Sequence, residues 1–236
     1  EEEMSFIRVF FQLGARMMHL TYNRRNMIGD GCMESADAGL SDFGRGVVAE
    51  MNRVGVMVDV AHCGQRTSLE AAKASALPVI ASHTGSQALS GHRRCKNPEV
   101  IKAIADSGGL IGVCCVPAFL GLSGDIRAVL DHIDDLVRRV GVDHVAIGTD
   151  SGYSSTRSGA ENAKVPPRPR GRQNWANFWG DGDPLFDPQW RQPHMTQSLA
   201  WTNWPLFTVG LVQRGYSDDD VRKLVGGNIL RVFRTV

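Results

Sequence analysis

The sequence predicts an α/β fold in which parallel strands alternate with helices. Three observations support this: the chain length, a series of short apolar runs, and amphipathic segments between those runs. At 236 residues, the chain has about the size of one (β/α)8 barrel or one large α/β domain. Hydrophobic residues make up 42% and charged residues 22%, so there is enough apolar material for one sizeable core.

Five apolar runs of strand length occur between residues 14 and 150: ARMMHLTY, GVMVDVAH, LPVIASH, GLIGVCCVP and HVAIGTD. Each is rich in β-branched or other bulky apolar residues, as expected for buried parallel strands. Strands that alternate with helices are joined by crossovers into a parallel sheet. A closed barrel of eight strands would need three more than these five.

The segments between the runs have the spacing and end signals of helices. In residues 40–55, the apolar side chains fall on one helical face: Phe43, Val47, Val48, Met51 and Val54. In residues 97–109, Asn97 is a predicted N-cap, Pro98 occupies the first helical position and Gly108 follows the end. Residues 125–141 have apolar positions at helical spacing, and Gly141 is the stop signal.

The pattern changes after Tyr153. Residues 154–195 are rich in Gly, Pro, Asn and Arg, and they are too long for an ordinary connection, so we expect a long irregular loop or excursion. Its basic stretch KVPPRPRGR is interpreted as a solvated loop rather than a partner-binding arm. Residues 196–236 are predicted to be a C-terminal helical segment, in which Ser217 and Asp220 approximate a capping box. The whole chain, 1–236, is predicted to be a single partial barrel domain.

Composition excludes some classes of function. The formal net charge is +1, so no overall field favours nucleic acid or anionic lipid as a partner. No apolar run is long enough to predict a membrane span, and the acidic start EEEMSF does not resemble a signal peptide. The cysteines form no CxxC pair and are expected to be buried thiols: Cys32, Cys63, Cys95, Cys114 and Cys115. The cellular compartment stays open.

Three of the five strands end in a residue that binds metals or moves protons: His62, His83 and Asp150. The carboxyl ends of parallel strands meet at one edge, where α/β proteins bind ligands. Any one of these residues alone would more readily be structural, but their coincidence favours a site. Imidazole and carboxylate are the usual donors to a divalent ion such as Zn²⁺, which makes hydroxide available near neutral pH. Asp150 would transfer the proton or bind the metal directly.

Other polar side chains follow the same strands. Arg93 and Arg94 lie in the loop after His83, where a guanidinium would suit a substrate with a free carboxylate. Tyr22 and Asn23 come just beyond the first run, in a position to orient a carbonyl. By contrast, Asp59 is expected to be a buried, paired carboxylate and His19 to serve in packing. His92, His132 and His144 are expected at the surface or between helices, and His194 in irregular chain.

Together these stretches resemble the membrane (renal) dipeptidase family, the M19 metallopeptidases, from about residue 12 to the C-terminus. The matching motifs are LTYNRRN with GDG, MVDVAHCG, PVIASHTGS, RRCKNPE, VAIGTDSGY and VGGNILRVF. The resemblance implies a zinc-dependent dipeptidase on a TIM-barrel-like, amidohydrolase-type (β/α)8 fold. The five runs would then be barrel strands four to eight, with strands one to three missing from the 236 residues.

The resemblance also implies roles for single residues. His62 and His83 would be ligands of one of two zinc ions, Arg94 would hold the substrate's C-terminal carboxylate, and Asp150 would be the acid/base. The family's His-x-Asp pair and metal-bridging Glu precede this stretch, and Glu1, Glu2 and Glu3 are not assigned to the bridge. Tyr22 stands where mammalian members have a histidine near the scissile carbonyl, and its phenol is a possible donor there.

Two hypotheses remain open. One is an active metallodipeptidase, with a small dipeptide as substrate. The other is a non-catalytic or degenerate relative that binds peptide or metal and is inactive because the N-terminal ligands are absent. An incomplete barrel would expose sheet edges, and a second copy of the chain could cover them. We therefore include a homodimer among the expected partners.

Overall fold

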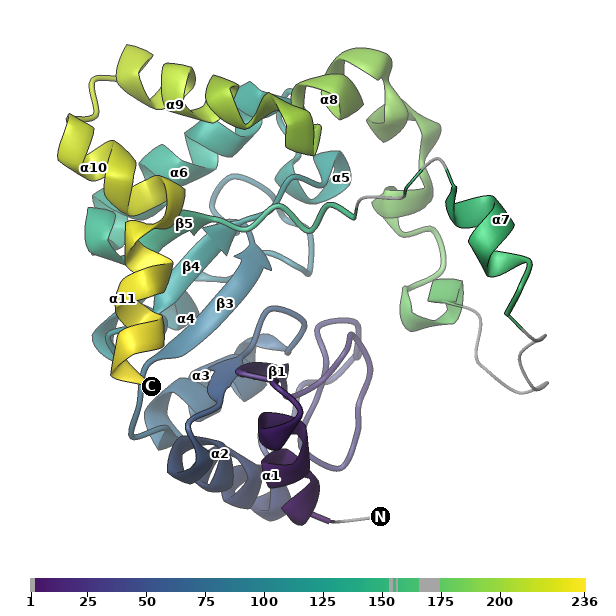
Figure 1. Cartoon of the computed structure of the whole chain (residues 1–236), viewed down its shortest axis with the longest axis vertical. Coiled ribbons are helices and arrows are strands. Elements are labelled where there is room, and N and C mark those ends of the chain that lie inside the picture. The colour runs from purple at the N-terminus through teal and green to yellow at the C-terminus, as the bar shows by residue number, and fades with distance from the viewer. Residues whose placement is uncertain (1–2, 153–154, 156, 166–174) are drawn as a thin grey trace.

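The computed structural model describes residues 3–152, 155, 157–165 and 175–236. Five parallel strands form one sheet in the order β1-β2-β3-β4-β5 (Figure 1). Their bounds are β1 (Met17–His19), β2 (Met57–Asp59), β3 (Val79–Thr84), β4 (Leu110–Val113) and β5 (Val145–Ile147). The prediction of an α/β fold with a parallel sheet is therefore confirmed. The assignment of these strands to positions four to eight of a barrel stays a prediction.

Helices separate the strands and cover one face of the sheet. The helices of this part are α1 (Ser5–Gln12), α2 (Asp42–Val54), α3 (Gln65–Ala74), α4 (Pro98–Asp106), α5 (Pro117–Leu120) and α6 (Ile126–Val140). α2 contacts α3, α3 contacts α4, and α4 contacts α6, so these four form a continuous layer. The main hydrophobic core lies between this layer and the sheet, and all five cysteines are buried and free, as expected.

The helices begin and end at the capping and stop residues predicted from the sequence. Asn97 caps α4 by accepting a hydrogen bond from a backbone N–H, and Pro98 is the first helical residue. Gly141 ends α6 with φ 86°, a left-handed value that favours glycine. Ser217 and Asp220 form the capping box of the helix that follows them.

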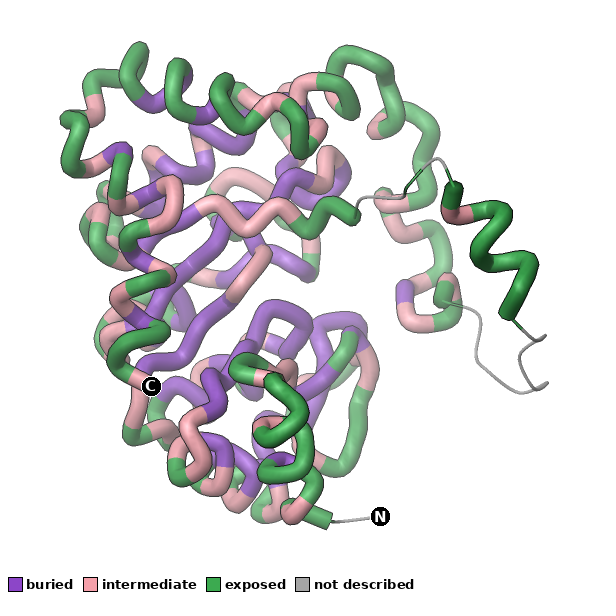
Figure 2. Tube along the Cα trace, in the orientation of Figure 1, coloured by how far each residue is buried: buried purple, intermediate pink, exposed green. Residues whose placement is uncertain are grey.

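After β5 the described chain contains short helices. They are α7 (Ser158–Asn162), η2 (Trp175–Phe178), η3 (Pro184–Phe186), η4 (Pro188–Arg191), α8 (Pro193–Ser198), η5 (Trp201–Asn203), α9 (Trp204–Gln213), α10 (Asp218–Arg222), the π-helical η6 (Lys223–Gly227) and α11 (Asn228–Thr235); η1 (Val142–His144) precedes β5. Most of the basic stretch at 164–172, interpreted above as a solvated loop, lies outside the described residues. Figure 2 shows that β3 and β4 are largely buried, whereas α7 is exposed.

The C-terminal helix α11 covers part of the sheet's second face. Its Val232 forms a small core with one residue from each of four strands: Met57, Ile80, Leu110 and Ala146. The Asn228 amide donates hydrogen bonds to the carbonyls of Val142 and Val145 and so ties the start of α11 to β5. This helix closes the face near the amino ends of the strands and leaves the carboxyl ends to the site.

An irregularity in β3 shapes that carboxyl end. The register between β3 and β4 shifts between Ala81 and Thr84, so the strand bulges at Ser82 and His83. The Ser82 carbonyl lies so close to Gly112 and Gly148 that a Cβ there would come within 2.1 and 1.8 Å of its oxygen. Gly112 in β4 and Gly148 directly after β5 thus accommodate the bulge that carries His83.

We expect Gly148→Ala to lower the free energy of unfolding by at least about 2 kcal/mol, because the added methyl group overlaps backbone that cannot yield locally. Denaturant titration of the parent and the variant measures this difference. Gly91→Ala is the control, since a Cβ there meets nothing within 4 Å and we expect a change of less than about 0.5 kcal/mol. Equal stability of Gly148→Ala and the parent would contradict the close approach.

Candidate metal and peptide site

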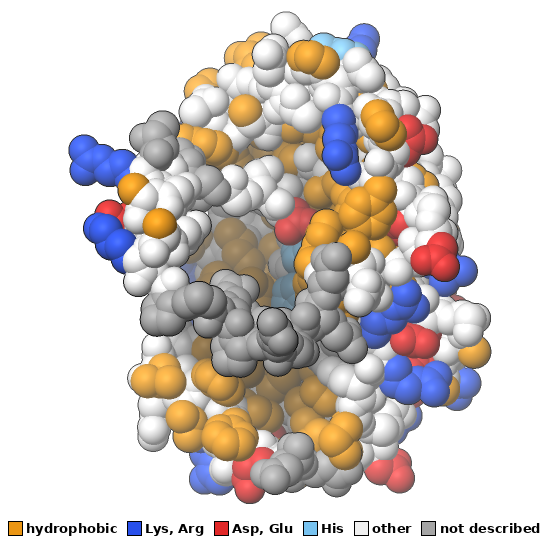
Figure 3. All heavy atoms as spheres, turned by 90° about the vertical axis from the view of Figure 1, so that its right-hand side faces the viewer, with side chains coloured by type: hydrophobic (Ala, Val, Ile, Leu, Met, Phe, Trp, Pro, Cys, Tyr) orange, Lys and Arg blue, Asp and Glu red, His pale blue; other side chains and the backbone are white. Residues whose placement is uncertain are grey.

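The carboxyl ends of the strands open onto a hollow in the surface. Figure 3 shows this face, with histidine side chains deep in the hollow, hydrophobic side chains around them and an acidic group at the rim. The structure brings together most of the residues predicted from the sequence: His62, His83, Arg94, Tyr22 and Asp150.

His62 and His83 point their Nε2 atoms at each other, 2.9 Å apart. The other nitrogen of each ring is already engaged. His62 Nδ1 lies 2.7 Å from Asn23 Oδ1, and His83 Nδ1 lies 2.7 Å from Ser82 Oγ. Because an amide oxygen only accepts, and because the Ser82 hydroxyl donates to Asp59, both Nδ1 atoms carry the proton. Both Nε2 lone pairs are therefore directed into the same small space.

The protonation of these rings suits a metal. Burial, followed by the charge of Arg94, lowers the pKa of His62 far below its ordinary value and the pKa of His83 to about 3. Both imidazoles are thus neutral at physiological pH, which is the form that binds metal ions. Tetrahedral Zn–N bonds of ~2.0–2.1 Å place two ligand nitrogens about 3.3 Å apart, so the observed separation needs only a small adjustment. The donor set therefore fits a zinc ion.

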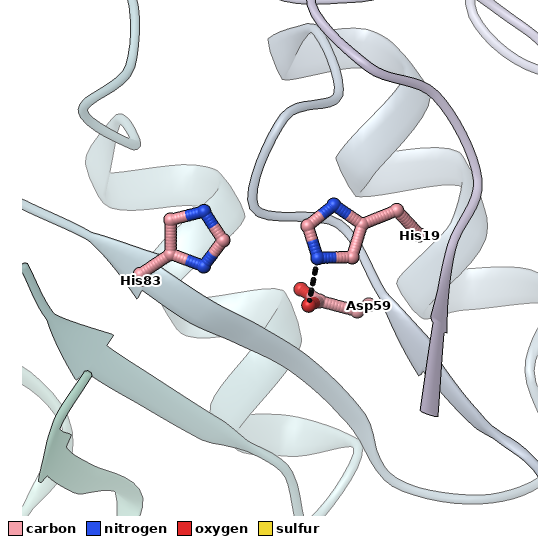
Figure 4. Close-up of side chains that lie close together, drawn as sticks. All are labelled: His19, Asp59 and His83. Carbon is pink, nitrogen blue, oxygen red and sulfur yellow. Dashed lines mark ion pairs between the residues drawn. The ribbon is translucent and has the colours of Figure 1, made fainter. Parts of the chain in front are cut away.

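Asp59 and His19 lie beside His83, and Figure 4 shows them paired with each other. Asp59 is fully buried, as expected, and its Oδ2 lies 2.8 Å from His19 Nε2. Burial acts to raise the pKa of Asp59, but the hydrogen bond and charge of His19, with the bonds from Ser82, hold it at about 2. The expectation that His19 serves in packing is wrong: its side chain is 30% exposed and pairs with Asp59, because it is the last residue of β1 and faces the site.

Asp150 stands at the rim after β5. Its backbone has φ 55°, which turns the chain sharply after the strand. Its Oδ1 lies 3.9 Å from His83 Nε2, and partial burial raises the pKa of its carboxyl, against the lowering effect of Arg94 and His19. Asp150 therefore places a carboxyl group beside the His83 ring.

The two adjacent arginines have different environments. Arg94 is fully buried and donates to the carbonyls of Ala61 and His83, while its Nη2 lies 3.4 Å from His62 Nε2. No carboxylate of the described chain forms an ion pair with it, and its Nε has no partner. Arg93 instead bonds the backbone of the 33–34 turn. Only Arg94 thus offers a charge to the site.

Tyr22 packs against the His62 ring. Its ring stacks on His62, with centroids 4.2 Å apart, and its hydroxyl accepts a hydrogen bond from Trp175 Nε1 at 2.9 Å. Phe178 meets the same ring edge-on. The aromatic residues of the excursion after β5 therefore return to the strand ends. Trp175 was not predicted as a site residue, although its aromatic-rich surroundings, NWANFW, were a signal.

Asn23 lies in a different place from the one expected. It is fully buried beneath His62, has φ 60° and engages that histidine through Oδ1, while its Nδ2 has no partner. Ser82 was also not predicted as a site residue, and its position next to a strand-end histidine was the only signal in the sequence. Both residues set the orientation of the histidine rings.

Comparisons with known proteins agree with this geometry. The family model described as Membrane dipeptidase (Peptidase family M19) matches residues 1–168. The dipeptidase tcpJ of Claviceps purpurea is 27% identical over 238 residues, which cover 98% of this chain and 47% of that protein. An amidohydrolase from Pseudomonas aeruginosa, known from a crystal structure, is 33% identical and has a TM-score of 0.77. The match covers 99% of this chain and 68% of the amidohydrolase chain.

A metallopeptidase from Rhodobacter sphaeroides, solved with a phosphinate mimic of L-Ala-D-Ala, shares the fold. Its TM-score is 0.71 at 22% identity, and the match covers 98% of this chain and 58% of the metallopeptidase chain. These likenesses place the fold among the amidohydrolase-type α/β barrels. The chain belongs to the membrane dipeptidase family, peptidase family M19. It spans about half the length of the curated relative. No helix within the described ranges is long and apolar enough to cross a membrane.

Proposed function

We propose that this protein is a metal-dependent dipeptidase that hydrolyses the peptide bond of small dipeptides. The observation that carries the proposal is the pair of Nε2 atoms of His62 and His83, 2.9 Å apart, beside the buried, carboxylate-free guanidinium of Arg94. The pair supports a zinc site, and the guanidinium supports a substrate with a free carboxylate. Family membership supports the same reaction class.

His62 and His83 would hold the zinc, which when bound supplies a Lewis acid and a water acidic enough to attack a carbonyl. The remaining groups act on the substrate. Arg94 binds the C-terminal carboxylate and brings the scissile bond to the histidine pair. Its contacts to the backbone beside both histidines keep its position fixed relative to theirs.

Asp150 acts as the acid/base. Its raised pKa favours a carboxyl group that takes a proton during attack and returns it to the leaving amine. Tyr22 donates to the substrate carbonyl: since its oxygen accepts from Trp175, its own proton is free to be donated. Asn23, assigned from the sequence to the substrate, would act on it through His62, by holding the Nδ1–H tautomer.

Metal content tests this proposal. We expect zinc in protein purified without chelator, near two ions per chain in a form extended at the N-terminus and one or none in the 236 residues alone. Dipeptide hydrolysis should disappear with a chelator and return with zinc. If neither form contains metal, the proposal fails and a peptide-binding protein without catalysis is the better description.

A further inference from the structure

A chain of hydrogen bonds connects His19 to His83. His19 Nε2 donates to Asp59 Oδ2 at 2.8 Å, the Ser82 hydroxyl donates to the same oxygen, and His83 Nδ1 donates to Ser82 Oγ at 2.7 Å. The four residues come from the ends of three neighbouring strands, β1, β2 and β3. Figure 4 shows the paired side chains of His19 and Asp59 facing His83.

The same group has the residue types of a metal site, since ligand atoms of His19, Asp59 and His83 lie within 4.8 Å of one another. The hydrogen bonds argue against that use. Asp59 Oδ1 accepts from the backbone N–H groups of Ala61 at 2.9 Å and Ser82 at 3.0 Å, and Oδ2 accepts from His19 and the Ser82 hydroxyl. All four lone pairs of the buried carboxylate are engaged, which leaves none for an ion.

We propose that His19 is a positioning residue that acts through Asp59 and Ser82 to hold His83 with Nδ1 protonated and Nε2 free for metal. This inference rests on the proposed function. Ser82 contacts Asp59 through both its hydroxyl and its backbone N–H, and these contacts also hold the β3 bulge. They therefore set the backbone position of His83 as well as the orientation of its ring. Outer-sphere partners of this kind tune metal affinity by orienting the ligand.

Zinc affinity of single and double variants tests the proposal by competition with a chromogenic chelator. We expect His19→Leu and Ser82→Ala each to weaken zinc binding by about 10- to 100-fold. Because both break the same chain, the double variant should lose no more than the greater single loss. His19→Gln should stay within about threefold of the parent, since the glutamine amide can replace the Nε2–H donor. The control is His144→Leu, which removes a histidine that bonds the Gly109 carbonyl at the amino ends of β4 and β5 and should leave affinity unchanged.

A second measurement needs no metal. The ¹⁵N shifts of the His83 ring in metal-free protein should show the Nδ1–H tautomer in the parent and in His19→Gln, and a mixture in Ser82→Ala. Parent-like affinity and tautomer in His19→Leu and Ser82→Ala would overturn the inference, as would additive losses in the double variant. If the parent binds no zinc at all, the proposed function fails. The ring shifts would still decide whether the hydrogen-bond chain from His19 sets the tautomer of His83.

Discussion

Arg94→Met should lower kcat/KM for dipeptides with a free C-terminal carboxylate by about 10³-fold, or ~4 kcal/mol of transition-state stabilisation. The guanidinium is fully buried, has no carboxylate partner in the described chain, and lies against His62. A substrate carboxylate would be the anion that this charge lacks. Steady-state kinetics of the purified parent and variant measures the loss.

Two comparisons make this prediction specific. Dipeptide amides lack the carboxylate, so the parent and Arg94→Met should hydrolyse them at rates that differ by less than about tenfold. Arg93→Gln is the matched control, because Arg93 bonds only backbone at the 33–34 turn and should keep parent kinetics. An equal loss on free and amidated dipeptides would show that Arg94 supports the structure of the site and does not bind the carboxylate.

His62→Ala should weaken zinc binding by about 10²- to 10³-fold. If the ~10–16 kcal/mol of a four-ligand zinc site is shared equally among its ligands, one ligand accounts for about 2.5–4 kcal/mol. The loss should be visible as zinc missing from the purified variant by elemental analysis, together with loss of dipeptide hydrolysis. His144→Ala is the control, since that ring lies at the amino ends of β4 and β5, opposite the carboxyl ends that carry the site.

The stability of His62→Ala has to be measured alongside, because the His62 ring also supports Tyr22 by stacking. A variant that melts like the parent and lacks zinc would support the ligand role. A variant that keeps its zinc with unchanged affinity would remove His62 from the metal site and leave it as a packing partner of Tyr22.

Much of the fold could be predicted because the signals are local. Buried parallel strands require continuous apolar runs, and the five runs became the five strands in sequential order. Asn97, Gly141 and Ser217 end or begin helices through bonds and dihedral angles within a few residues of themselves. Parallel strands bring their carboxyl ends to one edge, so His62 and His83 could be expected to meet there.

Other features of the site depend on contacts between residues that are far apart in the chain. The β3 bulge arises from pairing with β4, and it is tolerated because Gly112 in β4 and Gly148 directly after β5 accommodate it. The partner of His62 is Asn23, 39 residues away, and the sequence suggested a substrate contact for that residue instead. His19 was expected to pack, yet the register of β1 on β2 places it beside Asp59.

The sequence by itself therefore determined the α/β class, the strand ends that carry the site and the residue types gathered there, because periodicity and capping act over a few residues. Only the tertiary structure decided which nitrogen of each histidine is free, that the Arg94 guanidinium contacts His62, and that Asp59 is saturated with hydrogen bonds. These properties depend on strand register and on distances of a few ångströms between side chains of different elements, which no local pattern encodes.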